Sequence, residues 1–263
     1  MITAPTAPSH LAGEVFTAIS TATQIAPLTG RVDGFDLNMA YAIASEVRAL
    51  RDEAVVGHKI GFTNRTLWER YGVNAPMWGD MTASSVTPLD ETPVALAPYS
   101  EPRLEPEVAL KLKRSPNPGL DDEALLGCIE WFAPAFEIVQ SIYPGWAFKL
   151  ADCAAANGLH GRLLLGPTVP AGPWAHDMAA ITLQLMKNGE LIEVGHGHNV
   201  LGGPLLALRH FVEARLAHGA APLSVGDIIT TGTLTDAWSL SPGDRFEAIY
   251  SASPLPAISA TFR

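Results

Sequence analysis

Three glutamates carry the strongest chemical signal in the sequence: Glu105, Glu107 and, thirty residues later, Glu137. Residues 103–112 alternate polar and apolar side chains, as a half-buried strand does. Because residues at i and i+2 of a strand share a face, we expect Glu105 and Glu107 to point the same way. Pro106 between them donates no amide hydrogen, so this strand is expected to lie at a sheet edge or to be irregular there.

A helix and a second strand are predicted to bring the third glutamate to the first two. Residues 120–132 indicate a helix, with acidic residues that suit its positive N-terminus and an apolar stripe. Residues 135–139 indicate a short apolar strand with Glu137 in its middle. A strand–helix–strand crossover can lay two strands side by side, so we expect the three carboxylates to form one cluster.

Carboxylates without histidine or thiolate form a hard-oxygen site, which favours Mg²⁺ or Mn²⁺ over Zn²⁺. Like charges held this close destabilise a fold unless a cation neutralises them. The alternative is a solvated strand face, in which Glu105 and Glu107 pair with Arg103 and Lys111. Glu137 favours the metal site, because a carboxylate buried in an apolar strand needs a partner.

Composition narrows the class of protein. The chain has 263 residues, is 48% hydrophobic and can bury a large core. Its 17 basic and 27 acidic residues leave a formal net charge of −10, which speaks against a nucleic-acid or anionic-membrane partner. The sequence contains no signal-peptide pattern and no stretch of membrane-spanning length. Cys128 and Cys153 look like small core residues, and we expect a cytoplasmic, reduced protein.

The predicted fold class is α+β, with two regions along the chain. Residues 1–54 are expected to form a helical N-terminal region, with Ser9 and Asp36 as helix caps. Residues 55–263 are expected to form a strand-rich catalytic domain. A hairpin is predicted at Asn188-Gly189, and a helix from Pro204 to Gly219.

Lys59 stands out within the first predicted strand, residues 55–62. Gly57 and Gly61 flank it and allow another group to approach the backbone closely. The alternative is a surface lysine at a strand edge. The apolar and glycine neighbours favour a functional lysine.

Several short motifs, each weak alone, are specific as an ordered set from about Asp36 onward. They are Gly57-His58-Lys59-Ile60-Gly61-Phe62-Thr63, Tyr71-Gly72-Val73 leading to Trp78-Gly79, Pro102-Arg103-Leu104-Glu105-Pro106-Glu107, Pro134-Ala135-Phe136-Glu137-Ile138-Val139, Trp146 with Lys149 and Asp152, Lys187-Asn188-Gly189-Glu190, Val200-Leu201-Gly202-Gly203-Pro204, and residues 226–235. In this order they resemble the hydratase/decarboxylase branch of the fumarylacetoacetate hydrolase superfamily. That branch includes 2-oxopent-4-enoate hydratases and 4-oxalocrotonate decarboxylases of aromatic-ring catabolism.

The resemblance implies a β-rich fumarylacetoacetate-hydrolase-like body and a Mg²⁺ or Mn²⁺ ion held by Glu105, Glu107 and Glu137. It also implies that Lys59 is the acid/base group, with its pKa lowered by the neighbouring cation. A 2-oxo acid can chelate such an ion through its carboxylate and keto oxygens, and the ion then stabilises an enolate.

Thr233, in a Thr-Gly-Thr turn, is implied to bind the substrate carboxylate, although the turn alone equally fits an ordinary strand end. Lys149 is the second predicted substrate-binding residue, and His160 the third. His160 either reaches the active site and affects water delivery or caps a helix end.

Some residues depart from the pattern of the resemblance or leave the substrate open. His196 and His198 would share a face if their segment is extended, and would then bind a soft metal or contact substrate; ordinary loop histidines are the alternative. Arg65, Arg70 and Arg162 are candidates for binding a distal carboxylate, against surface arginines as the simpler interpretation.

The leading functional prediction is a metal-dependent hydratase. It would add water to a 2-hydroxy-2,4-dienoate, through its 2-oxo tautomer, and give a 4-hydroxy-2-oxo acid. The alternatives are a 4-oxalocrotonate-type decarboxylase, an acylpyruvate hydrolase and a non-catalytic 2-oxo-acid binder. Glu137 argues against the hydrolase, because hydrolases of the superfamily usually present aspartate as the third ligand. The predicted partner is the small-molecule substrate, and the resemblance implies a homo-oligomer.

Overall fold

The structure is a computed structural model and describes residues 8–263, apart from the side chains of residues 8, 70 and 71. Its α-helices are α1 (Pro8–Ser20), α2 (Leu37–Arg51), α3 (Trp68–Tyr71), α4 (Asp122–Leu126), α5 (Leu150–Ala155) and α6 (Pro204–Ala217). Its strands are β1 (Val55–Gly61), β2 (Met77–Thr82), β3 (Val86–Pro88), β4 (Arg103–Leu112), β5 (Ile129–Val139), β6 (His160–Leu165), β7 (Val169–Pro170), β8 (Thr182–Lys187), β9 (Glu190–His196), β10 (Ile228–Thr233), β11 (Trp238–Ser239), β12 (Arg245–Ser251) and β13 (Ile258–Thr261).

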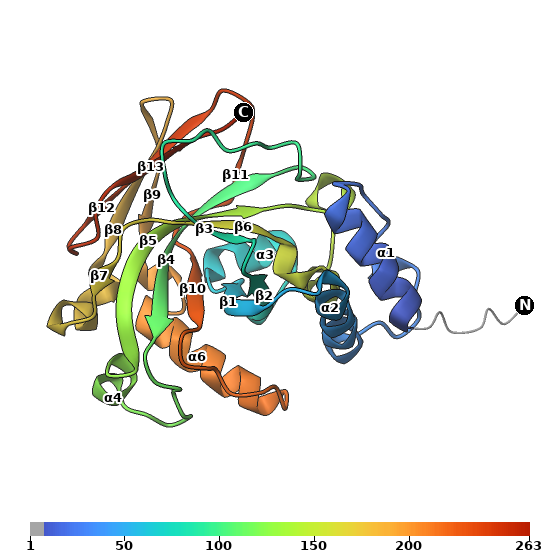
Figure 1. Ribbon diagram of the computed structural model, residues 1–263, viewed down its shortest axis with the longest axis horizontal. Helices are drawn as coiled ribbons and strands as arrows, with labels where there is room; N and C mark the ends of the chain where they lie inside the picture. The colour runs from blue at the N-terminus through green and yellow to red at the C-terminus, as the bar shows by residue number, and fades with distance from the viewer. Residues whose placement is uncertain (1–7) are drawn as a thin grey trace, which may run out of the picture.

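The larger sheet is mixed and curls into a half-barrel (Figure 1). Its order is β2-β1-β10-β4-β5-β6-β3, with β11 beside β4 and β7 beside β5. The β1–β10 and β3–β6 pairs are parallel, and the other pairs of this sheet are antiparallel. Its longest strands, β4 and β5, lie side by side near the centre. The predicted strand-rich α+β fold is confirmed.

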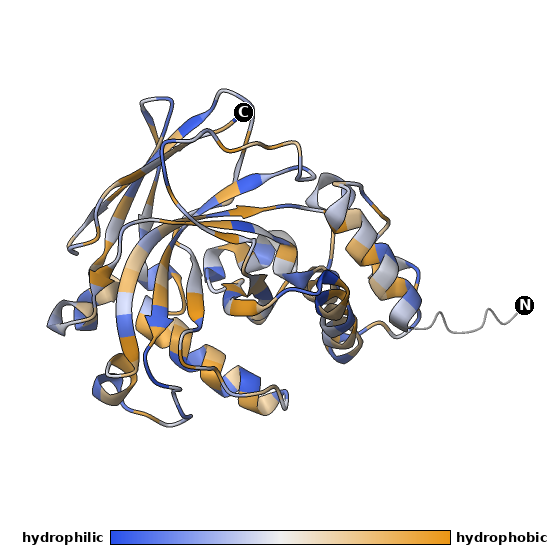
Figure 2. Cartoon of the chain, in the orientation of Figure 1, coloured by the Kyte–Doolittle hydropathy of each residue, from blue (hydrophilic) through white to orange (hydrophobic). Residues whose placement is uncertain are grey.

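The second sheet has the order β13-β12-β8-β9. The predicted hairpin joins β8 to β9, where Asn188 and Gly189 both take positive φ angles of 53° and 86°. Figure 2 shows hydrophobic and hydrophilic residues alternating along several strands, as expected for sheets with one buried face. Side chains of both sheets and of helix α6 share the main hydrophobic core.

The N-terminal helices have an apolar core of their own. Leu11, Val15, Ile43 and Val47 are buried together with alanines of α5. The Asp36 carboxylate accepts the Met39 amide hydrogen at 2.9 Å and caps α2 as predicted, whereas α1 already includes the predicted cap Ser9. The division into residues 1–54 and 55–263 stays a prediction, since α5 of the body completes this core.

The predicted helix over residues 120–132 is mostly wrong. Only α4 forms, capped by the Asp121 side chain, and β5 begins at Ile129. Residues 129–134 pair with β4 along its length, and Phe132, expected on the helix, is fully buried in the main core. Strand pairing and core burial therefore override local helix preference here.

The β4–β5 connection also differs from the expected crossover, because the two strands are antiparallel. Glu105 lies directly opposite Glu137, so the expected cluster forms by a simpler route. Pro106 is not at a sheet edge, since β4 is central, and it pairs regularly with Phe136 of β5; the irregularity lies in its other neighbour, β10. The Pro106 carbonyl accepts the Leu234 amide at 3.1 Å, and the register of β10 shifts between Thr230 and Thr233 beside it. Pro106 has no amide hydrogen to donate, and this is tolerated because the pairing of β4 with β10 is interrupted here.

Candidate active site

Strands β4 and β5 bring the three glutamates together. One carboxylate oxygen from each of Glu105, Glu107 and Glu137 lies within 4.8 Å of the others. Glu107 and Glu137 are fully buried, and Glu105 is partly exposed to the pocket. Because β4 is central and pairs with β5 through ten residue positions, the backbone under the cluster is rigid.

Two oxygens of the cluster have no hydrogen-bond partner. The Glu107 Oε2 atom accepts the Gly232 amide hydrogen at 2.7 Å, whereas its Oε1 atom is buried without a donor. Glu137 Oε2 is likewise buried without a hydrogen bond. Unpartnered buried carboxylate oxygens are costly, and a hard divalent cation satisfies them. The residues therefore fit the Mg²⁺ or Mn²⁺ ion expected from the sequence.

The pKa values of the three carboxylates are shifted in different directions by their surroundings. Burial raises the pKa of Glu105 to about 7, with Lys59 opposing this rise and Glu137 adding to it. Burial and both neighbouring glutamates hold the pKa of Glu107 well above its usual value. Burial acts the same way on Glu137, but Lys59 and then His160 outweigh it and lower its pKa. Glu137 is therefore the carboxylate that most readily ionises in the cluster.

Lys59 reaches the cluster from β1, across the intervening strand β10. Its Nζ atom lies 3.5 Å from Glu137 Oε2, and the residue is 3% exposed. Burial favours the neutral amine, but the three carboxylates outweigh it and raise the pKa of Lys59. The carboxylates raise the pKa of Lys59, whereas the cation expected from the sequence would lower it. Without the metal ion, Lys59 is therefore charged.

A turn before β6 packs against the Lys59 side chain. Asn157, Gly158 and Leu159 all have positive φ, and the Asn157 side chain hydrogen-bonds both the amide and the carbonyl of Asp80. A Cβ atom on Gly158 would lie 2.8 Å from Lys59 Cδ. Sequence reasoning missed this support, although the Asn-Gly dipeptide signals a turn.

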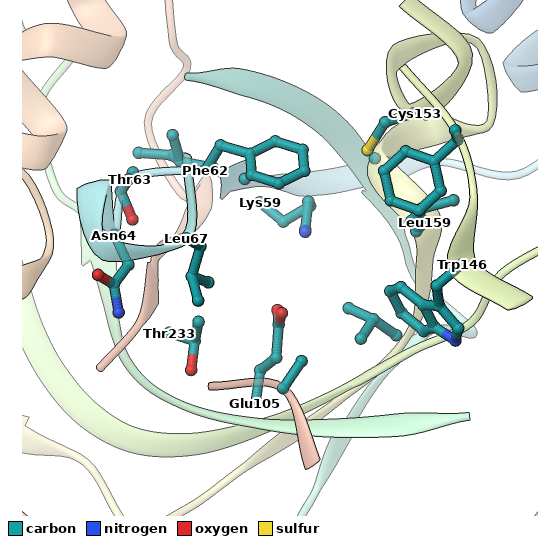
Figure 3. A pocket seen from close by; sticks show the side chains of 16 residues that line it. Lys59, Phe62, Thr63, Asn64, Leu67, Glu105, Trp146, Cys153, Leu159 and Thr233 are labelled. Atoms are coloured by element: carbon teal, nitrogen blue, oxygen red, sulfur yellow. The ribbon is translucent and has the colours of Figure 1, made fainter. Parts of the chain in front are cut away.

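Of the three carboxylates, Glu105 lines a pocket with about 530 Å³ of space, solvent included. Figure 3 shows Lys59 and Glu105 pointing toward one another across it. The remaining wall is largely apolar and aromatic. It includes Phe62, Leu67, Val139, Trp146, Phe148, Leu159 and Ala237.

Thr233 lines this pocket, as its predicted role requires. Its hydroxyl donates to the Thr235 carbonyl at 3.0 Å, and its neighbour Gly232 binds Glu107. Asn64 and Thr63 lie in the same wall (Figure 3) and were not singled out from the sequence. Thr63 supports the turn by donating to the Thr231 carbonyl at 2.9 Å.

The structure places two other predicted substrate-binding residues outside the pocket lining. Lys149 is exposed at the start of α5, where its amide donates to Asp152 at 2.9 Å. His160 is buried behind Glu137, with Nδ1 at 2.8 Å from Glu137 Oε1 and Nε2 at 2.9 Å from Ser85 Oγ. Both ring nitrogens are used within the protein, so a direct contact with substrate is not supported.

Of the remaining candidates, those with described side chains do not line the pocket either. His196 and His198 stack with ring centroids 5.1 Å apart, but His198 lies in a 3-10 turn rather than an extended segment. Arg65 is exposed and Arg162 half-buried, and the side chain of Arg70 lies outside the described residues.

The half-barrel places three glutamates and a lysine beside a largely apolar pocket, an arrangement that suits the active site of an enzyme. Residues 71–260 match the family model described as fumarylacetoacetate (FAA) hydrolase C-terminal. The chain therefore belongs to this family, in its hydratase branch.

The relatives and neighbours cover nearly the whole chain. A 2-hydroxyhexa-2,4-dienoate hydratase of Comamonas testosteroni is 33% identical over 89% of this chain and 90% of its own. A 2-keto-4-pentenoate hydratase of Paraburkholderia phymatum is 32% identical over 85% of this chain and 86% of its own. The solved 4-oxalocrotonate decarboxylase of Pseudomonas putida G7, complexed with magnesium and adipate, superimposes with a TM-score of 0.89 at 26% identity, covering 97% of each chain.

No helix in the described part of the chain combines the length and apolar character that crossing a membrane requires.

Proposed function

We propose that this protein is a metal-dependent hydratase of 2-hydroxy-2,4-dienoates. It is a hydro-lyase, as its hydratase relatives are. The observation that carries the proposal is the group of three glutamates around Lys59 at the end of an apolar pocket. Glu105, Glu107 and Glu137 would hold Mg²⁺ or Mn²⁺, which, when bound, supplies Lewis acidity to the carboxylate and keto oxygens of a 2-oxo acid.

The chain's own groups account for the proton transfers. Protonation of C5 of the dienol, with loss of the proton on the C2 oxygen, gives a 2-oxo-3-enoate. Water then adds at C4 while C3 takes up a proton, which leaves the 4-hydroxy-2-oxo acid. Lys59 is the proposed acid and base in these steps, because it is the cationic donor inside the pocket. Thr233, which lines the pocket, would orient the substrate carboxylate by turning its hydroxyl hydrogen from the Thr235 carbonyl to the substrate.

The pocket wall supports hydration over decarboxylation of a diacid. Beyond the carboxylates the lining is apolar, and Lys59 is its one cationic side chain among the described residues. Arg103 lies outside that lining, with its guanidinium 4.2 Å from the Trp146 ring centroid. A second carboxylate on the substrate would therefore be buried without a cationic partner, which is costly. An uncharged tail fits this wall.

The test follows the ultraviolet absorbance of 2-hydroxypenta-2,4-dienoate and of 4-oxalocrotonate, with Mg²⁺ or Mn²⁺. We expect metal-dependent loss of the dienoate signal, abolished in Glu107→Ala. Turnover of oxalocrotonate alone, with release of CO₂, would replace the proposal by a decarboxylase. Silence on both substrates with metal bound would leave a 2-oxo-acid binder.

A homo-oligomer and a cytoplasmic location stay predictions. The apolar faces of α1 and α2 pack within their own chain. Light scattering of the purified protein gives the number of subunits directly.

A further inference from the structure

The two fully buried glutamates of the cluster are held in the same way. In each, one carboxylate oxygen accepts a hydrogen bond from the protein and the other has none. For Glu107 the anchored atom is Oε2, bound by the Gly232 amide at 2.7 Å. For Glu137 it is Oε1, bound by His160 Nδ1 at 2.8 Å. The anchor of Glu107 is backbone, whereas that of Glu137 is a side chain that can be replaced.

His160 is itself held on its far side. The residue is 2% exposed, and its Nε2 atom lies 2.9 Å from the Ser85 hydroxyl oxygen. That hydroxyl accepts the Thr82 amide hydrogen at 3.0 Å and donates to the Thr82 carbonyl at 3.0 Å. The Thr82 carbonyl also accepts the Ser85 amide at 2.9 Å, so the position of Ser85 behind His160 is fixed.

The contact with Glu137 places a ring hydrogen on His160 Nδ1, because an ionised carboxylate can only accept hydrogen bonds. On the far side of the ring, Nε2 is held by the Ser85 hydroxyl oxygen. Hydrogen bonds therefore link Thr82 through Ser85 and His160 to Glu137.

We propose that His160, supported by Ser85, is a positioning residue that holds Glu137 by Oε1 and so keeps Oε2, which faces Lys59 at 3.5 Å, available to a metal ion. The inference rests on the proposed function, since it assumes that Glu137 is a metal ligand. Groups that hydrogen-bond a ligand from outside typically change metal affinity by roughly 10- to 100-fold when they are removed. His160 therefore acts through Glu137 and does not contact the substrate.

The test measures Mn²⁺ affinity by calorimetry, without substrate, for wild type, His160→Leu and His160→Asn. The asparagine amide can donate from about the position of Nδ1, whereas leucine cannot donate. We expect His160→Leu to bind Mn²⁺ roughly 10- to 100-fold more weakly, and His160→Asn to recover most of the affinity. Nitrogen NMR of the wild-type imidazole should find the hydrogen on Nδ1.

His58 provides the matched control. It is also buried, and its Nδ1 lies 2.8 Å from a carboxylate oxygen of Asp80, outside the cluster. His58→Leu should leave Mn²⁺ affinity within about twofold of wild type even if it lowers the melting temperature.

Unchanged affinity in His160→Leu would overturn this inference alone, and so would equal losses in His160→Leu and His160→Asn. A wild-type protein that binds no Mn²⁺ would overturn the metal site and the proposed function with it. Metal binding without hydratase turnover would remove only the proposed function.

Discussion

Two histidine–carboxylate pairs, one between β6 and β5 and the other between β1 and β2, differ in what surrounds the carboxylate. In the first, His160 binds Glu137 at 2.8 Å; in the second, His58 binds Asp80 at 2.8 Å. The second oxygen of Asp80 accepts from Arg48 at 3.0 Å, whereas the second oxygen of Glu137 has no hydrogen bond and faces Lys59.

The difference separates a structural carboxylate from a functional one. Asp80 is matched by protein donors at both oxygens, and its pKa is lowered because His58 and Arg48 outweigh the effect of burial. Glu137 shares its site with two further carboxylates that burial and mutual repulsion keep at raised pKa values. A divalent cation bound among these carboxylates would offset their mutual repulsion.

The largest expected effect comes from Glu107→Gln, which keeps the shape of the side chain and removes its charge. Because a catalytic metal supplies several kcal/mol to the transition state, kcat/KM should fall about 10³-fold or more. Steady-state kinetics on the dienoate measure this. Asp80→Asn is the control in the His58–Asp80 pair, and its kcat/KM should stay within about tenfold of wild type. Equal losses in the two variants would contradict a functional role for Glu107 and a structural one for Asp80.

Lys59→Met removes the proposed acid and base while keeping an unbranched side chain. General acid–base catalysis contributes about 10² to 10⁴ in rate, so kcat should fall by at least about 10²-fold. Mn²⁺ affinity should not weaken, because a positive charge beside the ion is lost. A variant with normal kcat would exclude Lys59 as the proton-transfer group.

Metal removal should destabilise the protein through the glutamate cluster and not through the His58–Asp80 pair. A ligand at about 100 times its Kd stabilises by roughly 2.7 kcal/mol, which corresponds to a melting-temperature rise of about 5–10 °C for a chain of this size. Calorimetry with Mn²⁺ and then with EDTA measures the shift. Asp80→Asn should melt lower but keep the shift, and Glu107→Gln should lose it.

The smallest effects on stability are expected from the groups around the His58–Asp80 pair. Arg48 is 45% exposed at its side chain, so Arg48→Ala should lower the free energy of unfolding by less than about 1 kcal/mol and leave kcat unchanged. The lowered pKa of Asp80 means that its ionised form stabilises the fold above the usual carboxyl pKa and less as pH falls. Urea unfolding should therefore find wild type and Asp80→Asn converging in stability below about pH 4.

Local patterns predicted the elements whose signals are short in range. The Asp36 cap, the Asn188-Gly189 turn and the helix beginning at Pro204 depend on neighbouring residues alone, and they occur as expected. The helix prediction for residues 120–132 was mostly wrong because their apolar spacing also fits a strand. Pairing with β4 places residues from Ile129 onward in a strand.

The sequence by itself determined which chemistry is available: three carboxylates without thiolate or histidine among them, a lysine between glycines, and the order of motifs that identifies the family. Only the tertiary structure decided which oxygens are already satisfied. Strand register sets Glu105 opposite Glu137, and a turn from a distant segment places His160 behind one glutamate rather than in the pocket. Hydrogen bonds between strands far apart in the chain depend on that register, and no local pattern encodes them.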